Sequence, residues 1–268
     1  MSSILNILES AFVITMLGLL ILFIFHINLA WSWAQNHLNQ EQELPDILAA
    51  AAIEWGGLIS ILGFHLKRIR RFYEAPPLLD SKVASQQIPI VFVPSLHHGP
   101  EIFHFLFWRL KKNFWNSLWP LRWKSFLQSP ELLEDQLAAF VEKVMSDTKS
   151  PRFRIISFGT SRPIVARLLN RSNLKSYCDK WIAISAPDEL SVVHRLLNSE
   201  RTRLAYEDNE YNHKDPDLLI VGERDLICYP PSVWGNGRFV QVAQMGHYGA
   251  ALHSLTTTSI IRELSESA

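Results

Sequence analysis

Strands and helices are predicted to alternate from residue 88 to the end of the chain. Short apolar runs rich in Ile, Val and Phe are typical of buried strands, whereas apolar residues spaced three and four apart indicate helices. The predicted strands are 88–94, 152–158, 181–185, 217–221 and 238–242, with a weaker one at 117–123. The predicted helices are 101–112, 131–145, 164–169, 192–197 and 259–264. This alternation predicts an α/β fold, with a mostly parallel sheet and helices on both of its faces.

The first 75 residues have a different pattern, which predicts a membrane-anchoring segment. Residues 11–30 are almost continuously apolar, and no residue between Glu9 and Glu41 carries a fixed charge. About 20 apolar residues cross the roughly 30 Å of bilayer hydrocarbon as a helix. The alternatives are a buried soluble helix and a signal peptide, but a signal peptide would begin with basic residues that this N-terminus lacks. We expect a membrane helix at about 11–30, ahead of an α/β domain at 76–268.

A second apolar run, residues 47–66, contains one acidic residue, Glu54. The run either returns through the bilayer to form a helical hairpin or lies at the interface with Glu54 turned to water. A charge in mid-bilayer costs about 2.5 to 3.5 kcal/mol, so both alternatives stay open. The basic cluster at 67–71 resists translocation. We therefore expect the α/β domain on the cytoplasmic side of the cell inner membrane.

Composition and charge narrow the functional classes. The 268 residues are 48% hydrophobic and 19% charged, which is typical of a folded protein and not of a disordered chain. The 26 basic and 26 acidic residues balance, and this neutrality argues against nucleic-acid binding. Two cysteines are too few for a disulfide scaffold, and His97, His98 and His104 have no acid or cysteine at ligand spacing. We expect neither a metal nor a cofactor.

Three predicted strand ends carry the residue types of a catalytic triad. Ser161 follows the strand that ends at 158, Asp225 follows the strand at 217–221, and His247 follows the last strand. The order serine, acid, histidine, each just past a strand, is that of α/β-hydrolases. In this chemistry the histidine takes the proton of the serine hydroxyl, and the acid orients the imidazole. Each residue also has a purely structural interpretation. Ser161 could cap the following helix, Asp225 could be a polar turn residue, and His247 could be a hydrogen-bonded loop histidine.

From about Ile88 onward the chain resembles bacterial α/β-hydrolases of the triacylglycerol lipase and esterase type. Its segment IPIVFVPSL is similar to the opening strand PVVLVHGL of that family, and IISFGTS followed by VARLL is similar to the nucleophile elbow GHSMGG-LVAR. Residues 222–230 resemble the segment around the family's acid, and MGHYGAAL resembles its histidine motif GHxxLL. The resemblance implies an α/β-hydrolase fold without a large lid domain, with Asp225 and His247 in the acid and histidine positions.

The elbow departs from the family pattern and can be aligned in two ways. One alignment places Ser161 on the nucleophile, with Gly159 and Pro163 two residues away on either side. The other places Thr160 there, between bulkier neighbours at positions 158 and 162. An elbow needs small residues at both flanking positions, so sterics favour Ser161, with Thr160 as the alternative nucleophile.

The expected oxyanion donors are the backbone N–H groups of Leu96 and Arg162. Leu96 keeps the family's position for this role, although Pro94-Ser95 replace the HG pair before it. The glycines after the family's nucleophile are also replaced, by Arg162-Pro163 under the preferred alignment. These changes leave open an inactive elbow.

The pattern as a whole predicts a membrane-anchored serine hydrolase of esterase or lipase type. Its substrate would be an apolar acyl ester or lipid at the membrane bilayer, cleaved by Ser161, Asp225 and His247. The alternative is a catalytically inactive α/β-hydrolase-fold protein that binds a lipid or a protein partner at the membrane. The sequence identifies no particular protein partner.

Overall fold

The computed structural model describes most of the α/β domain and a few residues before it. The described residues are 17, 18, 20, 24, 52, 54–57, 59, 87–96, 98–124, 128–171, 173–186, 215–223, 225 and 238–266. Outside them lie the basic cluster at 67–71 and three predicted features: the helix at 192–197, the domain boundary at 75–76 and most of the predicted membrane helix at 11–30. Within the described residues, no helix is both long and apolar enough to cross a bilayer.

In the part of the chain that the structure describes, six parallel strands form one sheet, which confirms the predicted α/β architecture. The strands are β1 (Ile90–Val93), β2 (Leu118–Pro120), β3 (Phe153–Phe158), β4 (Cys178–Ile184), β5 (Leu218–Gly222) and β6 (Arg238–Val242). Their order across the sheet is β2-β1-β3-β4-β5-β6, and each neighbouring pair is parallel. The carboxyl ends of all six strands therefore lie at one edge of the sheet.

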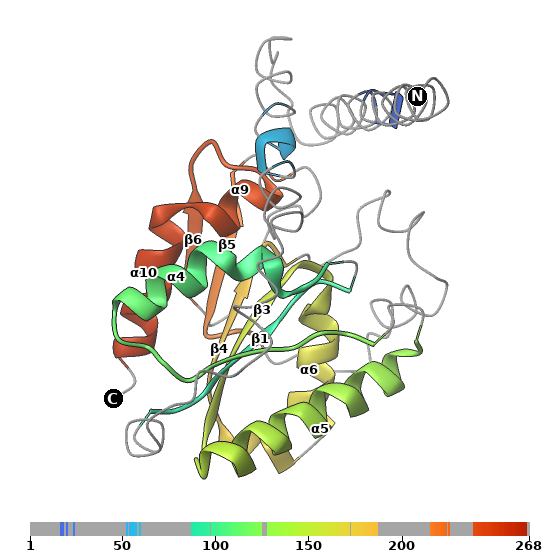
Figure 1. Ribbon diagram of the computed structural model, residues 1–268, viewed down its shortest axis with the longest axis vertical. Helices are drawn as coiled ribbons and strands as arrows, with labels where there is room; N and C mark the ends of the chain where they lie inside the picture. Colours follow the sequence, from blue (N-terminus) through green and yellow to red (C-terminus); the bar gives the residue numbers. More distant parts are fainter. Residues whose placement is uncertain are drawn as a thin grey trace, which may run out of the picture.

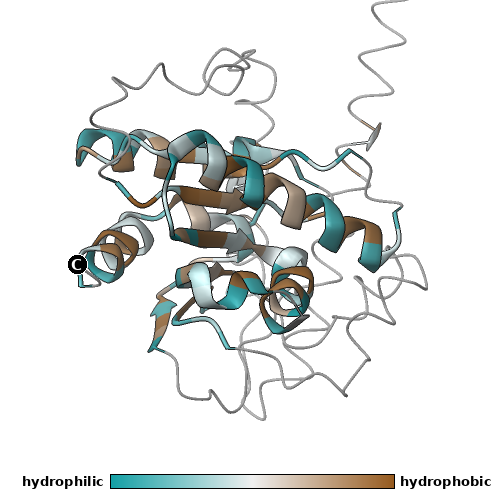
Figure 2. Cartoon of the chain, turned by 90° about the horizontal axis from the view of Figure 1, so that it is seen from below, coloured by the Kyte–Doolittle hydropathy of each residue, from teal (hydrophilic) through white to brown (hydrophobic). Residues whose placement is uncertain are grey.

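Helices cover both faces of the sheet, as Figure 1 shows. One face packs against α5 (Pro130–Thr148) and α6 (Arg162–Arg171). The other packs against α4 (His104–Lys112), α9 (His247–Leu252) and α10 (Ser254–Ser265). Along β1, Val91 faces the first layer and Phe92 the second, as the alternation of a strand requires. The strands are hydrophobic between helices whose outer surfaces are hydrophilic (Figure 2).

The longest helix among the described elements, α5, shows how local sequence sets an element's limits. It begins after Ser129, whose side chain accepts a hydrogen bond from the Leu132 N–H at 3.4 Å, and Pro130 takes the first helical position. Its buried apolar residues recur at spacings of three and four, at Leu133, Leu137, Val141 and Val144. The helix ends at Lys149, which adopts a left-handed conformation.

Short helical pieces account for the differences from the sequence prediction. The single predicted helix at 101–112 consists of a 3₁₀ turn, η2 (Pro100–Phe103), followed by α4, and two further 3₁₀ turns occur at η3 (Gly159–Ser161) and η4 (Asn173–Tyr177). The six-residue α9 was not predicted, because HYGAAL is too short to show helical periodicity. The closing helix begins five residues earlier than predicted, at Ser254, where the His253 side chain accepts from the Leu255 N–H at 3.1 Å.

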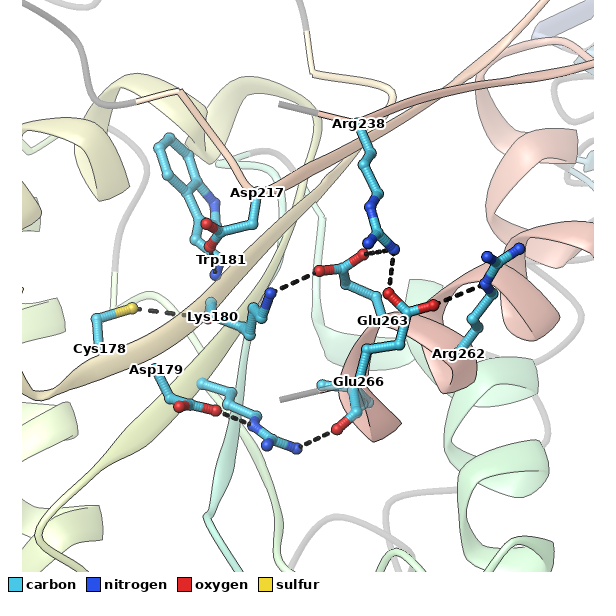
Figure 3. A network of polar contacts seen from close by, with 11 residues as sticks. Cys178, Asp179, Lys180, Trp181, Asp217, Arg238, Arg262, Glu263 and Glu266 are labelled. Carbon is cyan, nitrogen blue, oxygen red and sulfur yellow. Dashed lines mark hydrogen bonds and ion pairs between the residues drawn. The ribbon is translucent and has the colours of Figure 1, made fainter. Parts of the chain in front are cut away.

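A network of charged side chains ties α10 to the amino edge of the sheet (Figure 3). The Glu263 carboxylate of α10 contacts Lys180 of β4 at 2.8 Å and Arg238 of β6 at 3.1 Å. Beside it, Arg154 of β3 donates to Asp179 of β4 at 2.7 Å and to the Leu264 carbonyl at 2.9 Å. These contacts tie α10 to the amino edge of the sheet. The carboxyl ends of the strands lie at the opposite edge.

Candidate functional site

Three strand ends at the carboxyl edge supply the polar residues of the site. Gly159 directly follows β3, Asp225 lies three residues beyond the end of β5, and His247 begins α9 after β6. Because the strands are parallel, these loops converge although their residues lie far apart in sequence. The predicted convergence of the acid and the histidine is observed.

Asp225 and His247 form a buried acid–imidazole pair. The His247 Nδ1 lies 3.0 Å from Oδ2 and 3.2 Å from Oδ1 of Asp225. Asp225 is fully buried and His247 is 2% exposed. Burial by itself would lower the pKa of His247, but the Asp225 charge, its hydrogen bond and the Glu54 charge together raise that pKa above the usual 6.5. The arrangement is the one by which an acid orients a catalytic imidazole.

The backbone around His247 is held from neighbouring elements. Ser185, at the end of β4, donates its hydroxyl to the His247 carbonyl at 3.0 Å. The Phe158 ring packs edge-on against the imidazole, with a centroid separation of 4.8 Å. The hydroxyl of the next residue, Tyr248, is hydrogen-bonded to His98 Nε2 at 3.2 Å. The imidazole is thus fixed in orientation from several directions.

The strained residue of the strand-to-helix turn is Gly159. Its φ is +60°, a left-handed conformation that glycine adopts without steric cost. A Cβ at this position would lie 3.5 Å from His247 Nε2, the ring nitrogen that does not face Asp225. In a nucleophile elbow the nucleophile occupies the strained residue and directs its side chain at the histidine. Gly159 therefore occupies the position of the nucleophile, and it has no side chain.

Ser161, the predicted nucleophile, is not brought to His247. Its hydroxyl donates to the carbonyls of Val93 at 3.1 Å and Phe158 at 3.0 Å, and the residue is fully buried. Both acceptors belong to the carboxyl ends of strands, so the hydroxyl closes the base of the turn. The steric argument centred the elbow on Ser161, whereas the left-handed residue of this turn is Gly159, two residues earlier.

The sequence signal that was missed is the spacing of small residues around Gly159. Ser157 and Ser161 lie two residues before and two residues after it, and both are small and fully buried. Ser157 accepts a hydrogen bond from Trp181 Nε1 at 2.9 Å, which fills the space beside the turn. The segment SFGTS thus meets the elbow's crowding requirement with glycine at its centre.

The predicted oxyanion donors bond to groups of the protein itself. The Leu96 N–H donates to Thr160 Oγ1 at 3.2 Å, and the Thr160 and Ser95 hydroxyls lie 2.6 Å apart. Thr160, the alternative nucleophile, is therefore bonded at the oxyanion position and not at His247. The Arg162 N–H donates to the Gly159 carbonyl in the 3₁₀ turn η3, and its side chain reaches Asp215 at 3.4 Å.

Glu54 is a site residue that the sequence did not predict. It belongs to a helical turn at 54–57, is fully buried, and accepts backbone hydrogen bonds from His247 and, at 3.2 Å, from Tyr248. Burial and the Asp225 charge raise the pKa of Glu54 to about 7 against the opposing effects of His247 and the two N–H donors. The interfacial alternative had turned Glu54 to water, whereas the observed side chain is buried against this domain. Its partners lie 193 and 194 residues away, beyond any sequence pattern.

No group of three or more His, Cys, Asp or Glu side chains suited to hold a metal ion occurs among the described residues. The polar groups of the site are satisfied by one another: Asp225 by the His247 ring, and Glu54 by two backbone N–H donors. What the arrangement can do chemically is hold a correctly oriented imidazole beside a glycine. It holds no hydroxyl bonded to that imidazole among the described residues.

The sheet and its two helical layers define the class of protein: the chain has the α/β-hydrolase fold. Among solved structures it is similar to the mature form of a lipase from Bacillus licheniformis, with a TM-score of 0.52 and 13% identity over 66% of this chain and 92% of the lipase. It is also similar to lipase B of Aspergillus fumigatus, with a TM-score of 0.51 and 14% identity over 67% of this chain and 53% of that one.

The propeptide form of the Bacillus licheniformis lipase gives a TM-score of 0.53 at 13% identity, over 66% of this chain and 50% of that chain. The match thus spans about half of lipase B and of the propeptide form. No protein-family model matches the chain, and no curated protein matches it in sequence. At these identities the likeness shows the fold alone, and it confirms the α/β-hydrolase fold that the resemblance implied.

Proposed function

We propose that this protein is a non-hydrolytic α/β-hydrolase-fold protein that binds an apolar acyl ester or lipid at the membrane without cleaving it. The observation that carries the proposal is Gly159, which stands at the strained elbow position with no side chain to present to His247. Triad chemistry begins when the histidine takes a proton from a hydroxyl or thiol at this point. Without that group the imidazole has no nucleophile to activate there.

The ligand class follows from the fold's carboxyl edge and from its structural neighbours. In parallel α/β sheets, ligands bind beyond the carboxyl ends of the strands, where Asp225 and His247 lie. The two neighbours described above are named lipases. An apolar acyl chain also suits a protein with an anchor in the bilayer.

A membrane anchor at about residues 11–30 is part of the proposal. Leu17, Leu20 and Ile24 are helical, and each is more than half exposed, at 56%, 53% and 51%. A row of exposed leucine and isoleucine side chains is stable in lipid and costly in water. With the basic cluster at 67–71 on the inner side, the α/β domain lies at the cytoplasmic face of the inner membrane.

Serine hydrolysis through Ser161 is the competing function, and the intact Asp225–His247 pair is the observation in its favour. It requires Ser161 to leave the Val93 and Phe158 carbonyls and reach the imidazole. His247 would then act as general base and afterwards as general acid. The observed hydrogen bonds support a structural role for this hydroxyl.

A fluorophosphonate probe tests the proposal, because it labels only an activated nucleophile. We expect no labelling of the wild-type protein and none of Ser161→Ala. The informative variant is the pair Ser95→Gly with Gly159→Ser, since a Cβ at 159 would lie 3.2 Å from both Cβ and Oγ of Ser95. The pair should gain labelling, and adding His247→Ala should remove at least 90% of the gain. Wild-type labelling that disappears in Ser161→Ala would establish the competing function.

A further inference from the structure

We propose that residues 54–57, here called the strap, fold back over the Asp225–His247 pair and close that side of the site. Glu54 is the anchor of the strap. The strap lies directly beside α9 in Figure 1. It belongs to the N-terminal part of the chain, whereas α9 begins at His247, so the contact joins the two ends of the sequence. This inference is independent of whether the site hydrolyses esters.

The anchor is a carboxylate with two backbone bonds. One oxygen of Glu54 accepts from the His247 N–H and the other accepts from the Tyr248 N–H at 3.2 Å. Glu54 is fully buried in this position. Burying a carboxylate is costly unless such donors compensate, so the contact is specific to this residue type.

The shape of the strap also matches α9. A Cβ at Gly57 would lie 2.7 Å from Tyr248 Cβ and 3.2 Å from the Gly249 nitrogen, so only glycine permits this approach. The adjacent Gly56 has nothing within 4 Å of the same position. On the opposite side of the contact, a Cβ at Gly246 would meet the Glu54 carboxyl group. Each side of the contact thus has a glycine at a point where a Cβ would collide with a group of the other side.

The location gives the contact its functional meaning. Glu54 is the only charged residue between positions 47 and 66, and it is directed at the acid–histidine pair and not at water. The strap thus occupies the carboxyl edge, which is where α/β sheets receive ligands. A ligand that reaches His247 from this side has to displace the strap. Strap movement would also transmit a change at the membrane-anchoring segment to the site.

Amide hydrogen exchange of the full-length protein in detergent micelles tests the strap. The peptide that contains the amides of His247 and Tyr248 should be protected in the wild type. Gly57→Ala should raise its exchange rate at least tenfold by blocking the close approach, and Glu54→Ala should do so by removing the acceptors. Gly56→Ala is the matched control, because it makes the same change in helix propensity at an open position.

Two results would overturn the strap. One is equal protection of the 247–248 amides in wild type, Gly57→Ala and Glu54→Ala. The other is a rise with Gly56→Ala as large as that with Gly57→Ala. Exchange in α5, on the opposite face of the sheet, distinguishes strap release from general unfolding. If Gly57→Ala loosens α5 as well, Glu54→Ala, which adds no bulk, decides the question. Fluorophosphonate labelling plays no part in this readout, so the two proposals fail separately.

Discussion

At the scale of single residues, the site keeps two parts of a triad and lacks the third. Asp225 and His247 have the distances of a functional acid–imidazole pair. The strained elbow residue is Gly159, and the nearby hydroxyls of Thr160 and Ser161 bond to Leu96 N–H and to carbonyl groups. The described structure thus combines an acid–histidine pair with a glycine at the left-handed position of the turn.

Two buried titratable groups give the protein a pH-dependent stability. The folded pKa of Glu54 is about 7, against a usual 4.5, and that of His247 is raised above 6.5. A group with a raised folded pKa binds more protons when folded, so its contribution is present at low pH and is lost as pH rises through the folded pKa. The interval for Glu54 therefore runs from pH 4.5 to about 7.

We expect the unfolding temperature of the detergent-solubilised protein to fall between pH 5 and pH 8. Glu54→Gln should flatten this fall, because glutamine does not titrate. Between pH 5 and pH 8, the difference in unfolding free energy between the wild type and Glu54→Gln should change by on the order of 3 kcal/mol at most. This corresponds to about 5 °C in unfolding temperature. Differential scanning calorimetry across the interval measures it. Parallel pH profiles of the two proteins would contradict the assignment.

At the scale of elements, the parallel sheet separates a structural edge from a functional edge. The amino edge carries charged pairs that cross from β3, β4 and β6 to α10. The carboxyl edge carries the elbow, the acid–histidine pair and the strap contact. The arrangement lets the helices pack tightly without using the residues of the site.

Asp179→Ala should destabilise the fold strongly. Its partner Arg154 has a side chain only 4% exposed, so the substitution leaves a guanidinium group buried with one of its ionic contacts removed. Breaking such a pair typically costs about 3 to 5 kcal/mol. Asp147→Ala is the control, since it removes an exposed pair with Lys143 on α5, which is worth roughly 0.5 kcal/mol. Urea unfolding followed by circular dichroism compares them, and equal losses would contradict the inferred role of Arg154.

At the scale of the whole molecule, the strap joins the N-terminal part of the chain to the α/β domain. Glu54 and Gly57 contact α9, while the exposed apolar helix residues Leu17, Leu20 and Ile24 suit the bilayer. If the proposed membrane anchor holds, the strap keeps the carboxyl edge of the sheet at a defined place relative to the membrane.

Alkaline carbonate and high salt should leave the full-length protein in the membrane pellet, and detergent should release it. The reason is that a spanning helix is held by apolar burial, whereas peripheral attachment is electrostatic and is screened by salt. A chain that starts at Ala75 serves as the control and should remain in the supernatant. Recovery of the full-length chain in the salt wash would refute the anchor.

Much of the fold and half of the site followed from the amino-acid sequence. Strand and helix positions depend on local periodicity, and a parallel sheet brings the ends of its strands to one edge, so Asp225 and His247 were placed together correctly. The predicted strand and β3 both end at 158, but the turn that follows decides which residue of SFGTS takes the left-handed conformation, and the periodicity of the strand carries no information about that turn.

The strap contact depends on the whole tertiary structure. Glu54 and His247 are separated by 193 residues. The sequence around each one predicts nothing unusual: Glu54 is an acid in an apolar run, and His247 is a loop histidine. Only the packed domain decides that a carboxylate meets two N–H donors there, because the energy of that contact exists only when every intervening element is in place. Local periodicity predicts the elements, and long-range packing decides which side chains meet.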